Sequence, residues 1–195
     1  LRKVELMLHR RPVVKKLLKN RPDNVLVVSG LGSSTWDVTS AGEDDRNFRF
    51  IGAMGQAGPF ALGLALAQPE KRILLFTGDG ELLMSLGVLA TIANQSPSNL
   101  VIVALDNESY VETGSQPTAT AGPTDLEAVA RGCGIVATRT ITEQSEFNVL
   151  RDLIFDSSGP VFVNVKIISE VLPLVFPKSF DGVTAMNRFR DVATS

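Results

Sequence analysis

The sequence predicts an α/β fold: a doubly wound, mostly parallel open sheet with helices on both of its faces. Two observations carry this prediction. Short apolar runs of strand length alternate along the chain with longer segments of helical character. Polar or glycine-rich residues follow several of these runs, as they do in the loops at the carboxyl ends of parallel strands.

The clearest strands lie in the middle of the chain. Residues 73–77 and 100–105 are short, largely apolar runs, as expected of strands that are buried on both faces. Residues 82–93, between them, are apolar with few helix breakers, and we expect one helix there. Together these segments form a strand–helix–strand unit, whose two strands we expect to be parallel neighbours.

The residues before this unit follow the same alternation. Pro22 ends a long helical pattern, and Ser33 or Ser34 is expected to cap a short helix that ends at Ser40. In chain order we expect a helix over 2–20, strand 25–29, loop 30–34, the short helix, polar loop 42–47, strand 48–51 and helix 57–67.

A long irregular stretch rich in Thr, Ser, Gly and Pro runs from residue 108 to about Pro123. Loops of this length in compact domains are often functional. Thr124 is expected to cap the next helix, with Glu127 at the capping-box position. We then expect helix 125–131, strand 135–138, helix 143–155, strand 161–167, an extended apolar segment 173–177 and helix 181–192.

The composition favours one domain that spans residues 1–195, with a helical segment over 1–22 and a helix within 178–195. A hydrophobic content of 44% is ample for a buried core, and a net charge of −2 argues against a nucleic-acid partner. No apolar run reaches the length of a membrane span. The one cysteine, Cys133, excludes an internal disulfide and fits a cytoplasmic location.

Two polar motifs follow the two central strands. Gly78-Asp79-Gly80 comes after the first strand, and Asp106-Asn107 comes after the second. Neighbouring strands lie about 4.8 Å apart, so the side chains of Asp79 and Asn107 are expected within reach of one ion. Carboxylate and amide oxygens are hard ligands that suit Mg²⁺ or Ca²⁺. Each motif alone is also a common turn, and it is their combination that indicates a metal site.

The order Gly-Asp-Gly, helix, strand and Asp-Asn resembles the signature of thiamine diphosphate (ThDP) enzymes. The resemblance implies the ThDP-binding fold and two cofactors, ThDP and Mg²⁺. Asp79, Asn107 and the backbone carbonyl of Ser109 would hold the Mg²⁺, and the ion would hold the diphosphate of the cofactor.

The residues around these ligands are expected to contact the cofactor itself. Gly78 and Gly80 belong to the diphosphate-binding turn, and the missing Cβ of Gly80 lets the backbone approach the phosphates. The N–H groups of Glu81 and Leu82 open the next helix and would donate to phosphate oxygens. Either the Glu81 side chain is exposed near the positive end of the helix or it faces the diphosphate; we favour the exposed position. Tyr110 follows the metal loop and is expected to pack rather than react.

A second stretch strengthens the resemblance. Residues 52–58, Gly-Ala-Met-Gly-Gln-Ala-Gly, are similar to the family segment that supports the two rings of ThDP. By that resemblance the carbonyl of Gly52 accepts a hydrogen bond from the 4′-amino group of the cofactor. Met54, beside Ala53, would wedge between the rings and hold the cofactor bent, as a flexible thioether can.

From residue 25 to residue 165 the chain resembles the β subunit of sulfopyruvate decarboxylase and the matching domain of phosphonopyruvate decarboxylase. The resemblance implies a carboxy-lyase subunit that decarboxylates a 3-substituted pyruvate, such as sulfopyruvate. Four residues of the matching segment are candidate substrate contacts: Thr113, Ser115, Gln116 and Thr118.

The activating glutamate of ThDP enzymes lies on a pyrimidine-binding domain for which this chain has no room. The resemblance therefore implies a hetero-oligomer in which an α subunit supplies that glutamate, and we expect the chain alone to be inactive. Gly52 and Met54 would be its own contribution to cofactor activation. His9, the one histidine, precedes every motif and is expected to be a surface or packing residue rather than a catalytic one.

Three other functions remain open. The chain could belong to a phosphonopyruvate decarboxylase. The chain could belong to an acetolactate-type carboligase, although nothing in it encodes the middle domain of those enzymes. It could also be a catalytically inactive scaffold with the same fold, against which the intact Asp79, Asn107 and Met54 argue.

Overall fold

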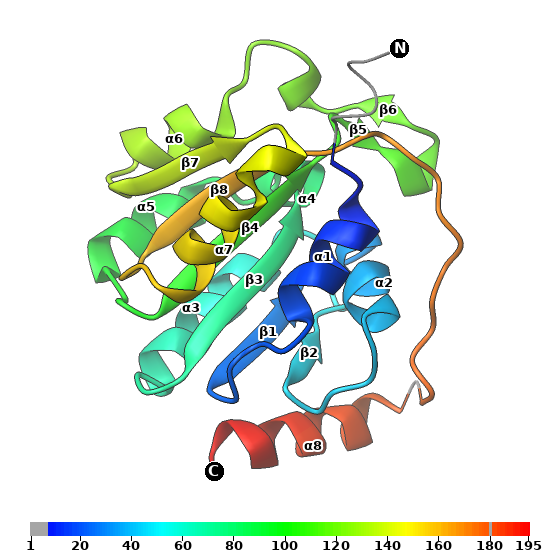
Figure 1. Cartoon of the computed structure of the whole chain (residues 1–195), viewed down its shortest axis with the longest axis vertical. Coiled ribbons are helices and arrows are strands. Elements are labelled where there is room, and N and C mark those ends of the chain that lie inside the picture. The colour runs from blue at the N-terminus through cyan, green and yellow to red at the C-terminus, as the bar shows by residue number, and fades with distance from the viewer. Residues whose placement is uncertain (1–7, 180) are drawn as a thin grey trace.

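The computed structural model describes residues 8–179 and 181–195 and shows a six-stranded sheet (Figure 1). All of its strand pairs are parallel. Across the sheet the strands are β2 (Asn47–Arg49), β1 (Val25–Ser29), β3 (Arg72–Gly78), β4 (Leu100–Asp106), β8 (Val161–Lys166) and β7 (Ala137–Ile141).

Helices cover both faces of the sheet, which confirms the predicted fold class. On one face lie α1 (Arg10–Leu18), α2 (Ser33–Ser40) and α7 (Phe147–Phe155). On the other lie α3 (Ala57–Ala67), α5 (Gly87–Gln95), α6 (Leu126–Gly132) and α8 (Gly182–Ala193).

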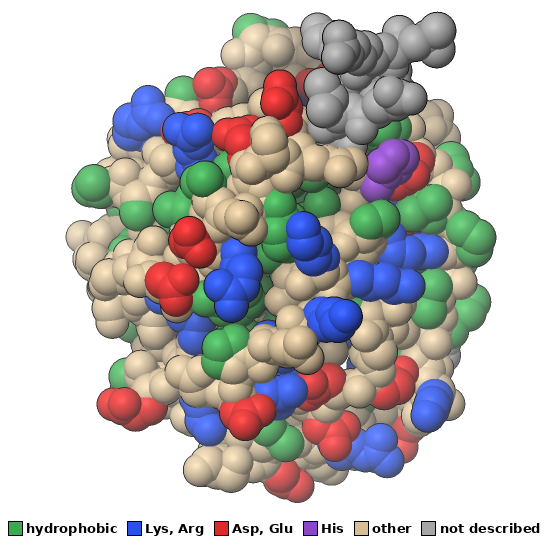
Figure 2. Space-filling model, viewed as in Figure 1, with side chains coloured by type: hydrophobic (Ala, Val, Ile, Leu, Met, Phe, Trp, Pro, Cys, Tyr) green, Lys and Arg blue, Asp and Glu red, His purple; other side chains and the backbone are tan. Residues whose placement is uncertain are grey.

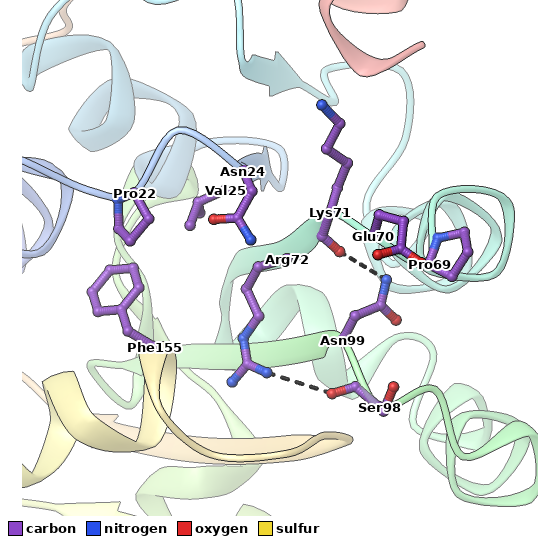
Figure 3. A pocket seen from close by; sticks show the side chains of 10 residues that line it. All are labelled: Pro22, Asn24, Val25, Pro69, Glu70, Lys71, Arg72, Ser98, Asn99 and Phe155. Atoms are coloured by element: carbon purple, nitrogen blue, oxygen red, sulfur yellow. Dashed lines mark hydrogen bonds between the residues drawn. The ribbon is translucent and has the colours of Figure 1, made fainter. Parts of the chain in front are cut away.

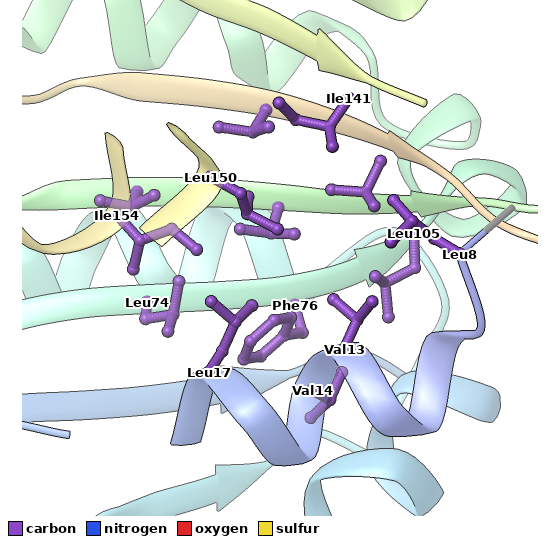
Figure 4. Close-up of a cluster of buried hydrophobic side chains, with 14 of the residues drawn as sticks. Leu8, Val13, Val14, Leu17, Leu74, Phe76, Leu105, Ile141, Leu150 and Ile154 are labelled. Atoms are coloured by element: carbon purple, nitrogen blue, oxygen red, sulfur yellow. The ribbon is translucent and has the colours of Figure 1, made fainter. Parts of the chain in front are cut away.

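Alternate residues of each strand supply the two cores. In β3, Leu74 and Phe76 face α1 and α7, whereas Ile73 and Leu75 face the opposite layer. Figure 4 shows Leu17 of α1 directed at Phe76. Full burial of one such side chain contributes about 1.5–3 kcal/mol, so both layers hold the central strands firmly.

The direction in which the sheet is built reverses between β1 and β3. From β1 the chain passes through α2 to the edge strand β2, whereas from β3 it passes to β4 on the other side through α4 (Asp79–Leu83) and α5. The register places Ser29 beside Phe76 and Gly78 beside Leu105, so the three carboxyl ends lie at one edge. Such a switch point forms a crevice in which ligands of open α/β sheets bind.

The predicted helix over 82–93 is wrong, because the structure has two helices there. α4 begins at Asp79 and ends at Leu83, and α5 follows a bend at residues 84–86. The bend passes close to Gly55, which has a φ of +80°. A Cβ on Gly55 would lie 3.2 Å from the Cβ atoms of Met84 and Ser85, so only glycine permits this approach.

The start of the first helix also differs from the prediction. Residues 2–7 of the expected helix lie outside the described residues. The helix begins only at Arg10, because Leu8 forms a parallel bridge with Ile167 and His9 has extended backbone. His9 is exposed, as expected, and its Nδ1 lies 3.1 Å from Oε2 of Glu170.

Two predicted helix caps are wrong. Ser33 and Ser34 lie within the first turn of α2, after an N-cap at Gly32 that makes no side-chain hydrogen bond. At α6 the cap is Asp125 rather than Thr124, and its carboxylate accepts a 3.0 Å hydrogen bond from the backbone N–H of Ala128. In both cases a neighbouring residue, Gly32 or Asp125, takes the N-cap position because it satisfies the same residue preference for an N-cap.

Elsewhere the boundaries shift by a few residues. The strand expected over 135–138 is β7, which begins at Ala137, because Ile135 packs into the core beside α6. The strand expected over 48–51 is β2. The helix expected over 143–155 opens with a 3₁₀ turn, Gln144–Glu146.

At the amino-terminal edge of the sheet, polar side chains bind loop carbonyls (Figure 3). Nδ2 of Asn99 lies within 3.1 Å of the carbonyls of Ala65, Gln68 and Lys71, and Nε of Arg72 donates to the carbonyl of Ile154. These groups satisfy backbone acceptors at and near the ends of helices and strands. The surface hollow that Arg72 and Asn99 line at this edge therefore has a structural explanation.

Charged side chains of both signs are interspersed over the face shown in Figure 2. Among the described residues, no helix has both the length and the apolar character needed to cross a bilayer.

Candidate active site

A cavity of about 620 Å³ lies at the switch point between the carboxyl ends of β1 and β3. This volume is within the range of small-molecule sites. Its lining comprises Arg10, Leu31, Gly32, Ser33, Ser34, Met54, Gly78, Asp79, Gly80, Glu81, Met84, Leu105, Asn107, Ser109, Tyr110, Val111, Glu112, Thr113, Gln116 and Ile167. Both motifs that follow the central strands therefore reach one cavity.

Asp79 is the first residue of α4 and is 2% exposed. The hydroxyls of Thr118 and Thr120 lie 2.6 and 3.0 Å from its Oδ2. Burial raises the pKa of this carboxyl, and the charge of nearby Asp106 raises it further, although the threonine hydrogen bonds lower it. In the described part of the chain no Lys or Arg forms an ion pair with Asp79. A cation at this position would therefore stabilise a buried charge.

Asp106 lies at the end of β4 and already has a cationic partner. Lys166 lies 2.8 Å from its Oδ2, Asn164 donates to the same oxygen, and Thr120 lies 2.8 Å from Oδ1. The backbone N–H of Glu108 also donates to Oδ1. Asp106 thus holds the turn that follows it, and its neighbour Asn107 lines the cavity.

The turn after β4 presents the other two expected metal ligands. Oδ1 of Asn107 accepts a hydrogen bond from the N–H of Ser109 across Glu108, which has a φ of +61°. Ser109 and Tyr110 form β5, which pairs with β6 (Gln116–Pro117) as a short hairpin. The chain therefore folds back on itself, and this return brings Thr118 and Thr120 to Asp79.

The donor set fits a hard divalent cation. Asp79, Asn107 and Ser109 all line the cavity, and they offer carboxylate, amide and carbonyl oxygens. Within the described ranges no three His, Cys, Asp or Glu residues cluster as a metal site, so an ion here depends on the neutral oxygens as well.

Gly80 lies against the ring of Tyr110. A Cβ at Gly80 would overlap this ring, so glycine is required by the tyrosine as well as by any phosphate. Tyr110 is half-buried and packs, as expected. Leu82 is buried in the core and does not line the cavity.

The expectation that Glu81 is exposed is wrong. Its side chain lines the cavity but is 3% exposed, because it accepts hydrogen bonds from Thr77 Oγ1 and from the N–H of Leu31. Burial raises the pKa of this carboxyl to about 6, although these bonds and others from the backbone of Gly55 and Gly78 oppose the rise.

The expected ring-binding residues divide into two groups. Met54 lines the cavity, as a residue that bends the cofactor must. Gly52 and Ala53 are exposed and lie outside the lining. Their exposure leaves them free to meet a group that enters from outside this chain.

The four candidate substrate contacts are also divided. Thr113 and Gln116 line the cavity and bond each other, the side chain of Gln116 donating to the carbonyl of Thr113. Ser115 is exposed outside the lining. Thr118 is buried, and its hydroxyl donates a hydrogen bond to the carboxylate of Asp79. The structure therefore places Thr118 as a support for that carboxylate.

Several lining residues were missed from the sequence. Arg10 is the one basic side chain among the described lining residues, and its Nη1 donates to Asp37 and to the carbonyl of Ser33. Its Nε is buried without a partner in the described structure. The polar loop after β1 signals the Ser33 region, whereas nothing local in the N-terminal helix marks Arg10 as a cavity residue. Glu112 accepts a hydrogen bond from Ser33 Oγ at the cavity rim.

The family model for the thiamine pyrophosphate enzyme C-terminal TPP binding domain matches residues 30–165. The chain belongs to this family. The matched residues include the loop after β1 and the segment after β4, which both line the cavity, and the turn that carries Asp79.

Curated relatives narrow the relationship. The chain is 40% identical over 169 residues to "Sulfopyruvate decarboxylase subunit beta" of Methanothermobacter thermautotrophicus, with 83% of each chain covered. The protein of the same name from Methanocaldococcus jannaschii is 38% identical over 136 residues, 70% of each chain. The "Phosphonopyruvate decarboxylase" of Streptomyces viridochromogenes is 35% identical over 89% of this chain, but this chain covers only 41% of that protein. These relationships confirm the resemblance and class the chain with the ThDP-dependent carboxy-lyases.

A solved structure supports the fold. An X-ray structure of a proposed thiamin diphosphate-dependent enzyme isolated from Mycobacterium smegmatis superposes with a TM-score of 0.71 and 21% identity. It matches 84% of this chain, which spans 32% of the length of that protein. The longer relatives thus contain other parts beside the region that this chain matches.

Proposed function

We propose that this chain is the β subunit of a cytoplasmic 2-oxo acid decarboxylase that uses ThDP and Mg²⁺. Its substrate is a 3-substituted pyruvate such as sulfopyruvate, and it acts together with an α subunit that carries the pyrimidine-binding domain. The names of its relatives support the reaction and the two-subunit organisation.

The buried carboxylate of Asp79 carries the metal part of the proposal. It lies in the wall of the switch-point cavity, without a cationic partner among the described residues, beside Asn107 and Ser109. Asp79, Asn107 and the carbonyl of Ser109 would hold Mg²⁺, and the ion would bridge to the diphosphate. Arg10 adds a positive charge to the same wall.

Each part of the cavity then has a task. When bound, ThDP would supply the nucleophilic carbon and the electron sink that decarboxylation of a 2-oxo acid requires. Met54 would support the two rings of the cofactor, and Gly78 and Gly80 would let the backbone approach its phosphates. The apolar side chains of Leu31, Leu105 and Ile167 are also in the lining and reduce the access of water.

Exposed residues that line the cavity or precede the lining residue Met54 in the sequence support the need for a partner. Ile51 is 50% exposed and Met84 is 57% exposed, and Gly52 and Ala53 beside Ile51 are exposed as well. A neighbouring subunit would cover these residues and deliver the activating glutamate.

The direct test is to purify the chain together with a candidate α subunit that carries a pyrimidine-binding domain. CO₂ release is then measured with sulfopyruvate, phosphonopyruvate and pyruvate, with and without the partner. We expect release from a 3-substituted pyruvate by the pair, and none by this chain alone. Turnover by the isolated chain would contradict the partner requirement. A product in which a new carbon–carbon bond has formed would identify a carboligase rather than a simple decarboxylase.

A further inference from the structure

The carboxylate of Glu81 connects the separate segments that form the switch-point cavity. Its Oε1 accepts a 3.3 Å hydrogen bond from the N–H of Leu31, in the loop after β1. Its Oε2 accepts a 2.9 Å hydrogen bond from the hydroxyl of Thr77, at the end of β3. The backbone groups of Gly55 and Gly78 also lie close enough to this carboxylate to lower its pKa.

The loop after β1 is shaped to receive this side chain. A Cβ on Gly30 would overlap the Glu81 carboxyl group, and both of its oxygens and its carbon are near that position. The N–H of Gly30 also donates to the carbonyl of Phe76 at 2.8 Å, which holds the loop against β3. Gly30 and Glu81 therefore occupy complementary space across the crevice.

The linked segments are those on which the proposed function depends. Leu31 belongs to the loop that leads into α2, Gly55 follows the ring-supporting Met54, and Gly78 precedes the metal ligand Asp79. The two hydrogen bonds and the nearby backbone groups of Gly55 and Gly78 bring segments that are far apart in the sequence to one carboxylate. Without them, each loop is held at the crevice by fewer contacts.

We propose that Glu81 is a positioning residue that holds the loop after β1, the ring-supporting loop and the start of α4 in the cofactor-binding arrangement before the cofactor arrives. This inference rests on the proposed function, because it deepens the role of the same cavity. Preorganised loops bind a ligand with less loss of conformational entropy, so the benefit appears mainly in cofactor affinity.

Glu112 provides a matched comparison. It is also a glutamate in the cavity lining, but it is exposed and accepts one hydrogen bond, from Ser33. Glu81→Gln and Glu112→Gln remove the same charge from the same cavity. Only the first replaces an acceptor by an amide NH₂ group that faces N–H donors.

The test is amide hydrogen exchange on the full chain without cofactor, followed by calorimetric titration of the chain–partner complex with ThDP and Mg²⁺. In Glu81→Gln we expect the amide of Leu31 to exchange about fivefold faster or more, because it loses a hydrogen bond. The amides of Gly55 and Gly78 should also exchange faster, because they lose their contact with the carboxylate. The Glu112→Gln chain should match the wild type at these amides. Apparent ThDP affinity should fall about tenfold in Glu81→Gln, with kcat at saturating ThDP within about threefold of the wild type.

Thr77→Val keeps the experiment decisive if Glu81→Gln does not fold. It removes one hydroxyl donor at similar volume and should accelerate exchange at Leu31 and Gly55 by a smaller factor. Unchanged exchange at these amides in the variants would overturn the inference. A wild-type complex that binds no ThDP would instead refute the proposed function, since the exchange result needs no cofactor.

Discussion

Asp79, which follows β3, and Asp106, which ends the neighbouring strand β4, contact the same hydroxyl group. Oγ1 of Thr120 lies 3.0 Å from Oδ2 of Asp79 and 2.8 Å from Oδ1 of Asp106. A threonine hydroxyl has one proton and can donate to only one of them at a time. Asp106 has Lys166 and Asn164 as further partners, whereas Asp79 has Thr118. The uncompensated charge therefore belongs to Asp79, the residue that faces the cavity.

Thr120→Val should weaken the Mg²⁺-dependent binding of ThDP. The substitution keeps the shape but removes the hydroxyl that separates the two carboxylates, so we expect about 1–3 kcal/mol of lost stability and about tenfold weaker ThDP binding. Thermal unfolding and calorimetric titration of the complex measure the two effects. Thr91→Val, in which an exposed helical hydroxyl loses its contact with the carbonyl of Gly87, is the matched control and should change neither.

Gly80→Ala should displace Tyr110, because the added Cβ would overlap its ring. We expect ThDP binding to weaken more than tenfold, since both residues line the cavity. Adding Tyr110→Ala to Gly80→Ala should recover part of the affinity. Gly63→Ala in α3 has nothing within 4 Å of the new Cβ and should be neutral or stabilising by up to about 1 kcal/mol. Equal binding by Gly80→Ala and wild type would refute the assigned contact.

Arg10→Met should destabilise the chain in a pH-dependent way. Burial raises the pKa of the Asp37 carboxyl, and the charge of Arg10 is the largest influence that lowers it. Without Arg10 the pKa of the Asp37 carboxyl in the folded state rises further. The resulting loss of stability is absent below the unfolded-state pKa of about 3.9 and fully present above the folded-state pKa. We expect a loss of about 3 kcal/mol at pH 8 and a smaller loss at pH 4.5.

Urea unfolding at the two pH values measures this difference. Arg11→Met is the control, because Arg11 also bonds Asp37 but its side chain is more exposed. It should cost less at both pH values. A loss for Arg10→Met that does not depend on pH would contradict the assignment of the buried pair.

The order of the elements was predictable because each strand is a short apolar run with turn residues on both sides. Residues 25–29 and 57–67 were predicted with the bounds that the structure shows. The bend between α4 and α5 was not, because it depends on the approach of Gly55, which is distant in the sequence. Caps failed at Thr124 and Ser33, where an adjacent residue satisfied the same local rule.

The site was predictable where its residues stand in short motifs after strands or in segments that resemble the family. Asp79, Asn107 and Met54 stand in short motifs, and all three line the cavity. Arg10 reaches the cavity from a helix that precedes every motif, and Glu81 is buried by partners from the loop after β1 and from β3. Such placements depend on tertiary packing, which residue spacing does not encode.

The most direct test of the account is calorimetric titration of the chain–partner complex with ThDP in the presence of Mg²⁺, for the wild type and for Asp79→Ala. The account predicts saturable binding by the wild type that is lost when EDTA removes the metal. It predicts binding at least about 100-fold weaker in Asp79→Ala, with the unfolding temperature of the metal-free complex unchanged or raised, because a buried unpaired charge is removed. Equal affinity in the two complexes would contradict the assignment of Asp79 as the residue that anchors the cofactor through its metal.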